Sequence, residues 1–381
     1  MIPFNKPYAP EHISMSVAKK ILKAPLGDET QHHLTVDTLR VNHGILSDRQ
    51  VVFTQSATQA LEIMALCMDL NAHDEIIMPS FTYAATANAF ARTGARIVFA
   101  DIDPYTLNIS LETVAPLITK HTRAIIPIHY GGISADLDGL IKLIKGSEIR
   151  LLEDAAHGIG ANYKGKALGT IGSMGCLSFH HTKNITAGGS GGALIYDSFW
   201  HEQVQACLYQ GTNRSAFLDG KVPVYHWEQL GGEFLMTYYH QLFLEKALPD
   251  LDWVTNRRLK ISNDFFNFLT SDYNFDEHIT FQKTVEGANG NGHIFPIILR
   301  DEALKRDLMT YLKANGIHAF THYEPLHMSR AGRKYGDTRV SLESTERIAS
   351  RLLRLPLYAT LTDSEVEKIL EHLKLFLKGR C

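Results

Sequence analysis

Short apolar runs and longer stretches with helical periodicity alternate along the chain between residues 50 and 200. The first run, Val51–Thr54, is followed by Ser56–Leu70, where apolar residues recur every three or four positions. The same alternation predicts further strands at Glu75–Met78, Arg96–Ala100, Ala124–His129 and Ile149–Glu153, with helices at Tyr83–Ala91, Leu111–Leu117 and Leu137–Ile144. Apolar strands separated by helices are typical of a parallel sheet covered on both faces. We therefore expect a large α/β domain over residues 1–250.

The pattern changes after residue 250. A long helical stretch, Asn256–Leu269, is followed by the glycine- and asparagine-rich segment Gly287–Gly292. Beyond it the sequence predicts strands at His293–Leu299 and His318–Thr321, and helices at Asp301–Ala314, Glu343–Leu353 and Asp363–Leu377. This mixture indicates a smaller α+β domain over residues 251–381.

Composition and charge narrow the classes of function. The chain has 381 residues, of which 45% are hydrophobic, enough for one large core and a smaller one. Its net charge is −3, and no run of lysine or arginine favours nucleic acid or an anionic membrane as a partner. The sequence has neither an apolar leader segment nor a run of 18 apolar residues, so we expect a cytoplasmic protein.

Cysteine and histidine positions argue against a metal site. The four cysteines, Cys67, Cys176, Cys207 and Cys381, have neither metal nor redox spacing, so we expect reduced thiols. The 19 histidines are scattered, and their adjacent pairs lack the i, i+4 spacing of a helical metal site. We expect no metal.

One lysine lies in a glycine-rich turn between two apolar runs. Lys183 follows Cys176–Phe179, and Gly188–Gly192 separates it from Ala193–Tyr196. A lysine kept from bulk water has a lowered pKa, and its amine becomes nucleophilic. Such an amine can form a Schiff base with an aldehyde cofactor. The alternative is a solvated turn lysine, which the flanking glycines and apolar strands disfavour.

A carboxylate closes a buried strand about 30 residues upstream. Asp154 follows the mostly apolar run Ile149–Leu152. Facing a pyridinium nitrogen, a carboxylate holds that nitrogen protonated and makes the ring an electron sink. Together with a Schiff-base lysine, this is the minimum for pyridoxal phosphate (PLP) chemistry. The alternative for Asp154 is a helix or turn cap.

Two strand-to-helix turns have the residues of a cofactor cradle. The helix that follows Thr54 presents free N–H groups, with hydroxyls from Ser56 and Thr58, as an anion site; the alternative is ordinary capping by Ser56. An aromatic ring in Pro79–Asn88 could stack on a flat cofactor or belong to the core. Such turns meet at one edge of an open sheet, which favours phosphate binding over capping.

Two later loops also carry polar side chains. Gly211–Ser215 offers donors for a phosphate or a sugar nucleotide, and His322–His327 could line a polar substrate pocket. An ordinary surface loop is the alternative for each.

At these residues the chain resembles the sugar aminotransferases of the DegT/DnrJ/StrS family. That family has the aspartate aminotransferase-like fold, PLP-dependent transferase fold type I. The resemblance runs from Ile2–Phe4 to Leu352–Leu357, and its specific pieces are Pro79–Thr82, Ala87–Phe90, Glu153–Ala156, Gly165–Gly172 and Lys183 with its glycines.

The resemblance implies a role for each site residue. It makes Lys183 the cofactor-binding lysine and catalytic base, Asp154 the partner of the ring nitrogen, and Tyr83 the ring that stacks on the cofactor. The cofactor phosphate is expected at Ala57, Thr58 and Ser178. Substrate contacts are expected at Phe4, Asn184, His322, Tyr323 and His327.

The chain also departs from the family pattern. His157 stands where glutamine is usual, and histidine can still donate a hydrogen bond to the cofactor's ring oxygen. Glu233 stands where many relatives have an asparagine that reaches the neighbouring subunit's phosphate. Since a carboxylate repels phosphate, we expect Asn213 to supply that donor. Tyr238–His240 replaces residues that are usually small.

The implied activity is transfer of the amino group of L-glutamate to the 4-keto carbon of a dTDP-4-keto-6-deoxyhexose. The product would be a dTDP-4-amino-4,6-dideoxy sugar for a surface polysaccharide such as lipopolysaccharide O-antigen. PLP would pass through pyridoxamine phosphate, in a homodimer with shared active sites. The alternatives are a 3-keto sugar or another nucleotide, and a non-catalytic regulatory protein with the PLP fold. Lys183 argues against the family branch that dehydrates sugars, which has histidine there.

Overall fold

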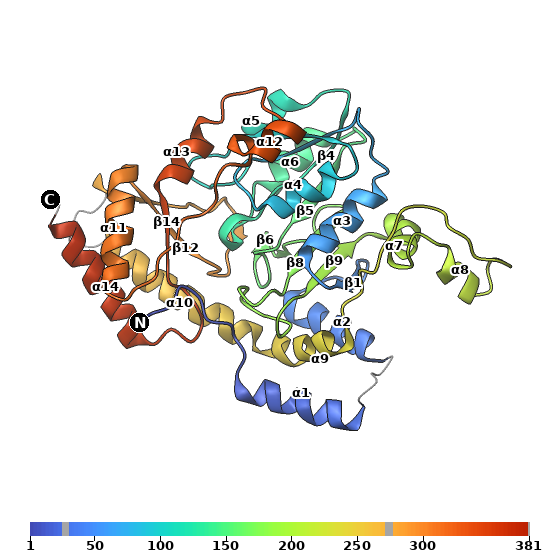
Figure 1. Ribbon diagram of the computed structural model, residues 1–381, viewed down its shortest axis with the longest axis horizontal. Coiled ribbons are helices and arrows are strands. Elements are labelled where there is room, and N and C mark those ends of the chain that lie inside the picture. The colour runs from blue at the N-terminus through green and yellow to red at the C-terminus, as the bar shows by residue number, and fades with distance from the viewer. Residues whose placement is uncertain (25–29, 271–276, 380–381) are drawn as a thin grey trace.

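The computed structural model describes residues 1–24, 30–270 and 277–379. Figure 1 shows a central sheet between helices, with α10, α11 and α14 at one end and the short helix α8 projecting from the other. The predicted α/β fold with a mostly parallel sheet is confirmed.

The central sheet has eight strands in the order β1-β9-β8-β5-β4-β2-β3-β13. Pairing is parallel from β8 to β13 and antiparallel on both sides of β9. The strands are β1 (Gln50–Thr54), β2 (Glu75–Pro79), β3 (Arg96–Ala100), β4 (Thr122–Ile125), β5 (Arg150–Asp154), β8 (Met174–Ser178), β9 (Gly192–Tyr196) and β13 (Gly336–Asp337).

Both faces of this sheet are buried, which explains why its strands are apolar throughout. Within β2, Ile76 and Met78 join the core on one face, while Ile77 joins the core on the other. The first core includes residues of α3 (Ala57–Cys67), α4 (Ala84–Ala91) and α7 (His201–Leu208). The second includes residues of α1 (Glu11–Lys23), α2 (Thr30–His43), α5 (Leu111–Val114), α6 (Leu137–Ile144) and α9 (Tyr238–Ala247).

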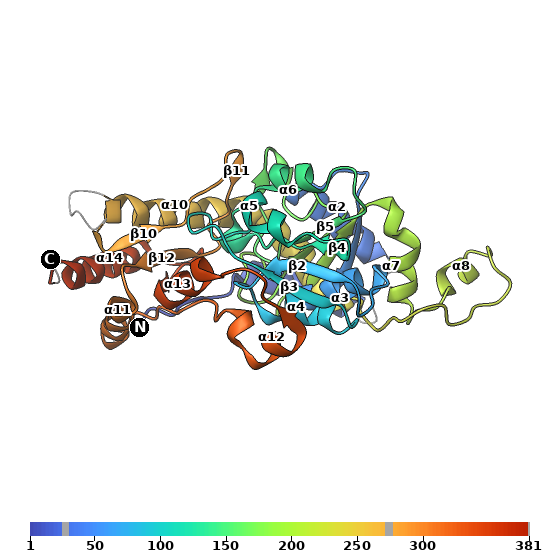
Figure 2. The same cartoon turned by 90° about the horizontal axis from the view of Figure 1, so that it is seen from above.

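The C-terminal part builds a second core around an antiparallel sheet ordered β10-β12-β14. Its strands are β10 (Ile279–Phe281), β12 (Phe295–Leu299) and β14 (Leu352–Leu355). Its helices are α10 (Leu251–Thr270), α11 (Glu302–Ala314), α13 (Glu343–Arg351) and α14 (Asp363–Lys378), with the short α12 (Arg330–Tyr335) beside β13. Figure 2 shows α10 and α14 as long rods beside the small sheet.

Short elements complete the described chain. A small sheet joins β6 (Asn162–Tyr163), β7 (Lys166–Ala167) and β11 (Ala288–Asn289), and α8 spans Arg214–Leu218. Two segments cross the predicted division at residue 250. Ile2 packs in the C-terminal core, and β13 pairs with β3 of the large sheet. The division itself stays a prediction.

Some predicted bounds were wrong. The helix expected to reach Leu353 ends at Arg351, because Leu352–Leu355 pairs with β12 instead. The strand expected at His318–Thr321 is reduced to a single bridge between Phe320 and Arg354. The sequence did not predict α1, α2 or α9.

Candidate active site

The turns at one edge of the large sheet meet the C-terminal part at a cavity of about 650 Å³. The turns after β1, β2, β5 and β8 all contribute, as expected for strands whose carboxyl ends share an edge. The predicted site residues that line it are Phe4, Ala57, Thr58, Tyr83, Asp154, His157, Ser178, Lys183, His322 and Tyr323.

Lys183 lies in the turn between β8 and β9 and lines this cavity. The turn is held by hydrogen bonds from the N–H of Lys183 to the carbonyl of His180 and from the N–H of His181 to that of Gly189. Burial lowers the pKa of Lys183 to about 8, although the charge of Asp154 opposes the shift. A larger share of the amine is therefore neutral and nucleophilic near neutral pH.

Asp154, at the end of β5, is the acidic side chain that lines the cavity. Its Oδ2 accepts a hydrogen bond from Thr86 Oγ1 at 2.7 Å. Its Oδ1 accepts from the N–H of Ala156 at 3.1 Å and from Cys176 Sγ at 3.7 Å. Burial raises the pKa of the Cys176 thiol, so this group keeps its hydrogen. The carboxylate is thus fixed in orientation before any ligand binds.

The start of α3 has the geometry of an anion cradle. Ser56 caps the helix by accepting the N–H of Gln59, so its predicted capping role and the cradle coexist. Ala57 and Thr58 lie in the first turn, where backbone N–H groups have no carbonyl one turn earlier. A Cβ on Gly192 would lie 2.4 Å from the nitrogen of Ala57, so only glycine lets β9 approach this turn so closely. The cradle, Lys183 and Asp154 together fit PLP.

Two neighbouring histidines form one wall of the cavity. The rings of His157 and His293 lie 4.2 Å apart between centroids. The N–H of Gly131 donates to His157 Nδ1 at 3.3 Å, so Nε2 carries the hydrogen of the neutral ring. Burial, together with the charge of Lys183, lowers the pKa of both histidines well below the usual value. His157 is therefore a neutral donor, as its predicted role requires.

His293 takes the opposite tautomer. Asn184 Nδ2 donates to the carbonyl of Asn291, so its Oδ1 accepts from His293 Nδ1 at 2.9 Å. This leaves His293 Nε2 as an acceptor. Asn184 is thus buried behind the wall and does not line the cavity, where sequence reasoning had placed it.

His322 belongs to the same aromatic group. Its Nδ1 lies 3.1 Å from the hydroxyl of the buried Tyr130, and its ring lies nearly parallel to that of His157 at 6.2 Å. Burial lowers the pKa of His322 to about 2, and the charge of Arg354 adds to the shift. Tyr83 stands at the rim with 65% of its surface exposed.

Three other residues singled out from sequence lie outside the lining. His327 Nδ1 contacts Ser80 Oγ at 2.7 Å, and its Nε2 pairs with Glu346, which ties its loop to the end of β2. Glu233 accepts from Gln210 Nε2 at 2.8 Å. Asn213 lies at the start of α8, away from the cavity of its own chain.

Sequence reasoning missed Thr86, His293 and Arg354 in this region. Arg354 carried a signal, since it is the lone charge in the apolar run Leu352–Leu357. Thr86 and His293 carried none, because their roles depend on contacts with distant residues.

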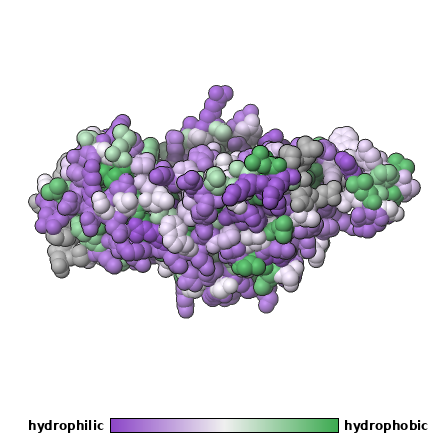
Figure 3. Space-filling view, turned by 90° about the horizontal axis from the view of Figure 1, so that it is seen from below, coloured by the Kyte–Doolittle hydropathy of each residue, from purple (hydrophilic) through white to green (hydrophobic). Residues whose placement is uncertain are grey.

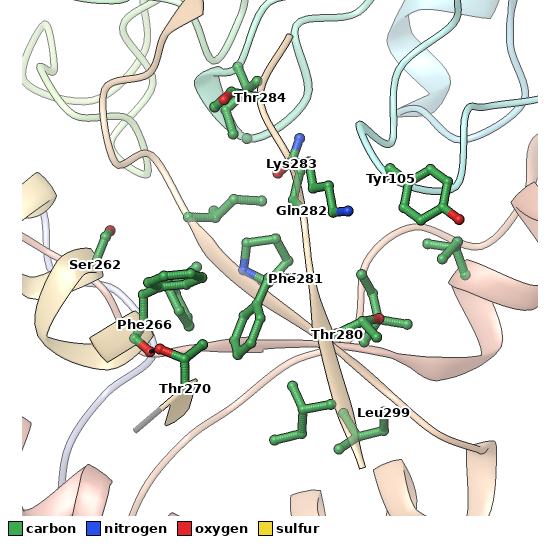
Figure 4. A pocket seen from close by; sticks show the side chains of 18 of the residues that line it. Tyr105, Ser262, Phe266, Thr270, Thr280, Phe281, Gln282, Lys283, Thr284 and Leu299 are labelled. Atoms are coloured by element: carbon green, nitrogen blue, oxygen red, sulfur yellow. Dashed lines mark hydrogen bonds between the residues drawn. The ribbon is translucent and has the colours of Figure 1, made fainter. Parts of the chain in front are cut away.

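A larger cavity of about 1200 Å³ lies beside α10 and β10. Figure 4 shows Phe266 and Phe281 near one another, with Lys283 and Tyr105 farther along it. None of the predicted site residues lines this cavity. We therefore place the proposed chemistry in the smaller cavity, which Lys183 and Asp154 line.

The described residues, 1–24, 30–270 and 277–379, contain no group of three or more histidine, cysteine or acidic side chains placed to hold a metal ion. They contain no helix that is long and apolar enough to cross a membrane. Cys67, Cys176 and Cys207 are buried free thiols, and Cys381 lies outside the described residues.

Known proteins resemble the chain over most of its length. A "Pleiotropic regulatory protein" of Geobacillus stearothermophilus is 31% identical over 325 residues, covering 85% of this chain and 84% of the relative. A "dTDP-4-dehydro-2,3,6-trideoxy-D-glucose 4-aminotransferase" of Saccharopolyspora spinosa is 28% identical over 349 residues, covering 90% and 85%. The crystal structure of the aminotransferase TlmJ from Streptoalloteichus hindustanus matches with a TM-score of 0.89 and 25% identity, covering 100% of this chain and 99% of that one.

The family pattern matches residues 43–374, a range that contains Lys183, Asp154, His157 and the cradle of α3. Both the fold and the fit of the cavity to PLP agree with that match. The chain belongs to the DegT/DnrJ/EryC1/StrS aminotransferase family and is a PLP-dependent sugar aminotransferase.

Proposed function

We propose that this enzyme transfers the amino group of L-glutamate to the 4-keto carbon of a dTDP-4-keto-6-deoxyhexose. The product is a dTDP-4-amino-4,6-dideoxy sugar for a surface polysaccharide. The observation that carries the chemistry is the partly neutral amine of Lys183 in one cavity with the fixed carboxylate of Asp154. When bound, PLP supplies the electron sink that makes a carbon next to nitrogen acidic.

The residues that line the cavity have separate roles in the proposed reaction, according to where they lie. Lys183 Nζ holds the cofactor at rest and then moves a proton on and off the substrate carbon. Asp154 keeps the cofactor's ring nitrogen protonated, and His157 Nε2 donates to its ring oxygen. Ala57, Thr58 and Ser178 receive the phosphate. Apolar side chains of Ile128, Ile294, Leu355 and Leu357 line the cavity and keep bulk water from the reacting atoms.

The substrate class is supported by one relative and by the cavity. The Saccharopolyspora spinosa relative bears the name of a dTDP-4-keto-sugar aminotransferase. The aromatic and histidine side chains of Tyr83, His322 and Tyr323 offer stacking surface and hydrogen-bond donors suited to a deoxysugar ring. A 3-keto sugar or another nucleotide remains the alternative within this class.

We also propose a homodimer whose active sites are shared. The segment around α8 carries exposed Phe217, Leu218 and Trp227, which a partner surface would cover. Within this segment Asn213 Oδ1 accepts the N–H of His226, which leaves Nδ2 free to donate. We assign Asn213 Nδ2 as a donor to the cofactor phosphate of the partner subunit, because the carboxylate of Glu233 would repel that phosphate.

A regulatory role is the second candidate, because the Geobacillus stearothermophilus relative is named for regulation. The two candidate functions differ in what they require of Lys183. A regulatory binding protein needs the cavity but no proton transfer by Lys183, whereas the enzyme needs both.

The replacement of Lys183 by alanine tests the proposal. We expect Lys183→Ala to fold but to lose at least about 100-fold of the transamination rate, since a positioned base contributes that much or more. The measurement is amino transfer from L-glutamate to dTDP-4-keto-6-deoxyglucose, with product stereochemistry read by NMR. Lys166→Ala, at an exposed lysine, is the control. A Lys183→Ala enzyme that keeps most of its rate would contradict the assignment.

The two half-reactions should also separate. Glutamate alone should convert the cofactor of the wild-type protein to its amine form, seen as loss of its visible absorbance. Addition of the dTDP-ketosugar should restore the band. Conversion without recovery would indicate a different acceptor, and no conversion by any amino acid would favour the regulatory protein.

A further inference from the structure

His293 brings an unused hydrogen-bond acceptor to the active-site cavity. It lies between the segment Gly287–Gly292 and β12, and it lines the cavity together with Lys183. Only 7% of its surface is exposed. Its Nδ1 is hydrogen-bonded to Asn184, whereas its Nε2 has no hydrogen-bond partner within residues 1–24, 30–270 and 277–379. A ligand in the cavity is therefore the candidate partner of Nε2.

Two buried asparagines fix the tautomer and the place of this ring. Asn184 Nδ2 donates to the carbonyl of Asn291 at 3.1 Å, which leaves Asn184 Oδ1 to accept from His293 Nδ1 at 2.9 Å. Asn291 Oδ1 accepts the N–H of His293 at 3.0 Å, and its Nδ2 donates to the carbonyl of His157 at 2.7 Å. The neutral ring of His293 therefore has its hydrogen on Nδ1 and a lone pair on Nε2.

The surroundings keep the ring of His293 neutral. Burial lowers the pKa of His293 well below its usual value, and the charge of Lys183 adds to the shift. A protonated ring would turn Nε2 into a donor, so burial preserves the acceptor. Once a ligand excludes water, an acceptor without a donor costs free energy, and a donor on that ligand removes the cost.

We propose that His293 is a specificity-determining residue whose Nε2 accepts a hydrogen bond from the 3-hydroxyl of the ketosugar, beside the carbon that receives the amine. This inference rests on the proposed aminotransferase function. In a 4-keto-6-deoxyhexose, C4 is flanked by C3, which carries a hydroxyl, and by C5, which carries the methyl group. The 3-hydroxyl is thus the hydrogen-bond donor nearest the reacting carbon, and that carbon must lie beside Lys183.

The other groups near the reacting carbon match an acceptor less well. The carboxylate of an amino donor has no hydrogen at neutral pH and would bring one lone pair against another. The amine of that donor is the group exchanged, so it is bonded to the cofactor during the reaction. The cofactor's ring oxygen has its own donor, because the proposed function assigns His157 Nε2 to it.

The test compares two sugars that differ in this hydroxyl alone. dTDP-4-keto-6-deoxyglucose has it, and dTDP-4-keto-3,6-dideoxyglucose lacks it. We expect the wild-type enzyme to favour the first by at least about 10-fold in kcat/KM, because the second leaves Nε2 of His293 without a donor. A general loss of activity does not change this ratio, since both sugars react with the same protein.

Replacement of the ring identifies the residue responsible. His293→Phe keeps a flat ring but removes the acceptor, so the two kcat/KM values should then agree within about twofold. The matched control is His372→Phe on α14, whose ring lies beside another aromatic ring, that of Tyr311, at 5.8 Å between centroids. This control should keep the preference of the wild type.

Binding of unreactive sugars supplies a readout that needs no turnover. dTDP-6-deoxyglucose and dTDP-3,6-dideoxyglucose have no keto group, and titration calorimetry measures their affinity for the PLP-loaded protein. We expect the wild type to bind the first at least about fivefold more tightly than the second, and His293→Phe to bind both about equally.

The outcomes separate this inference from the proposed function. An equal or reversed preference of the wild type in both comparisons overturns the hydroxyl assignment, even if the enzyme transaminates sugars. A preference that survives in His293→Phe overturns it as well, because another residue must then recognise the hydroxyl. A difference in affinity that depends on His293, in a protein that transaminates no 4-keto sugar, retains the hydroxyl site but refutes the proposed function.

Discussion

The amine of Lys183 is tuned by burial and by two neighbouring charges. Burial lowers its pKa to about 8, the carboxylate of Asp154 opposes the shift, and the guanidinium of Arg354 reinforces it. At pH 7 about one-tenth of such an amine is neutral, against less than about one-thousandth for an ordinary lysine. In the proposed function, the site therefore makes the amine of Lys183 more nucleophilic by excluding water, without needing a neighbouring base.

This tuning predicts how the apoprotein captures PLP. Only the neutral amine attacks the aldehyde, so the rate of capture should rise with pH around a midpoint of about 8 and level off above it. Stopped-flow absorbance after mixing apoprotein with PLP measures that profile. In Asp154→Asn the midpoint should fall, because the carboxylate raises the pKa of Lys183. A midpoint near 10.5 in the wild-type protein would contradict the proposed desolvation of Lys183.

At the scale of elements, the carboxylate beside Asp154 has a structural role. Glu153 lies in β5 and is fully buried. Its oxygens accept the N–H groups of Gly169, Ile171 and Gly172 at 2.6–2.9 Å, and His129 Nε2 lies 2.9 Å away. Burial alone would raise the pKa of Glu153, but these hydrogen bonds outweigh it and hold the pKa below the usual value. One side chain thus anchors the turn that leads into β8 and Lys183.

Glu153→Gln should destabilise the fold by about 3 kcal/mol, because an amide places a donor against backbone donors in a buried site. Urea unfolding followed by circular dichroism measures the loss. Since the pKa of Glu153 is lowered in the folded state, its contribution is present above about pH 4.5 and is lost as pH falls further. That acid-dependent loss should be smaller in the variant. Glu148→Gln, at an exposed carboxylate just before β5, is the control.

The sequence could predict those elements whose own apolar and polar residues follow a clear strand or helix pattern. Apolar runs between helical stretches predicted the strands β1 to β5 along the chain, although not their order in the sheet. Asp154 and Lys183 could be recognised because each polar residue ends or follows an apolar run. α2 was missed because its buried face includes Gln31, Thr35 and His43, which hide the helical period. His293 and Arg354 were missed because only the packing of the C-terminal part against the large sheet brings them to Lys183.

At the scale of the whole molecule, the segment around α8 is the feature least explained by a single chain. It projects beyond the body in the views of Figures 1 and 2, and Figure 3 shows hydrophobic residues gathered at that end. Its exposed apolar side chains are Phe217, Leu218, Val224, Tyr225, Trp227 and Leu230. Apolar surface of this extent on an extended segment is typical of a protein–protein contact.

The proposed homodimer predicts that this surface is covered by a second copy of the chain. Leu218→Asp should raise the dimer dissociation constant at least about 10-fold, because the interface would then bury an unpaired carboxylate. Sedimentation velocity over a range of concentrations measures this. Leu375→Asp is the matched control, since both leucines are 64% exposed and Leu375 lies on α14 at the other end.

Assembly and cofactor retention should fail together if the sites are shared. Asn213 stands next to this surface, and its free Nδ2 is the donor assigned to the partner's phosphate. We therefore expect the monomers formed by Leu218→Asp to release PLP about 10-fold more readily, and Asn213→Ala to do the same while remaining dimeric. Fluorescence of released cofactor on dilution measures the release in both variants, and sedimentation velocity distinguishes the monomer from the dimer. A fully active monomer, or an Asn213→Ala dimer that holds PLP as tightly as the wild type, would show that each chain completes its own site.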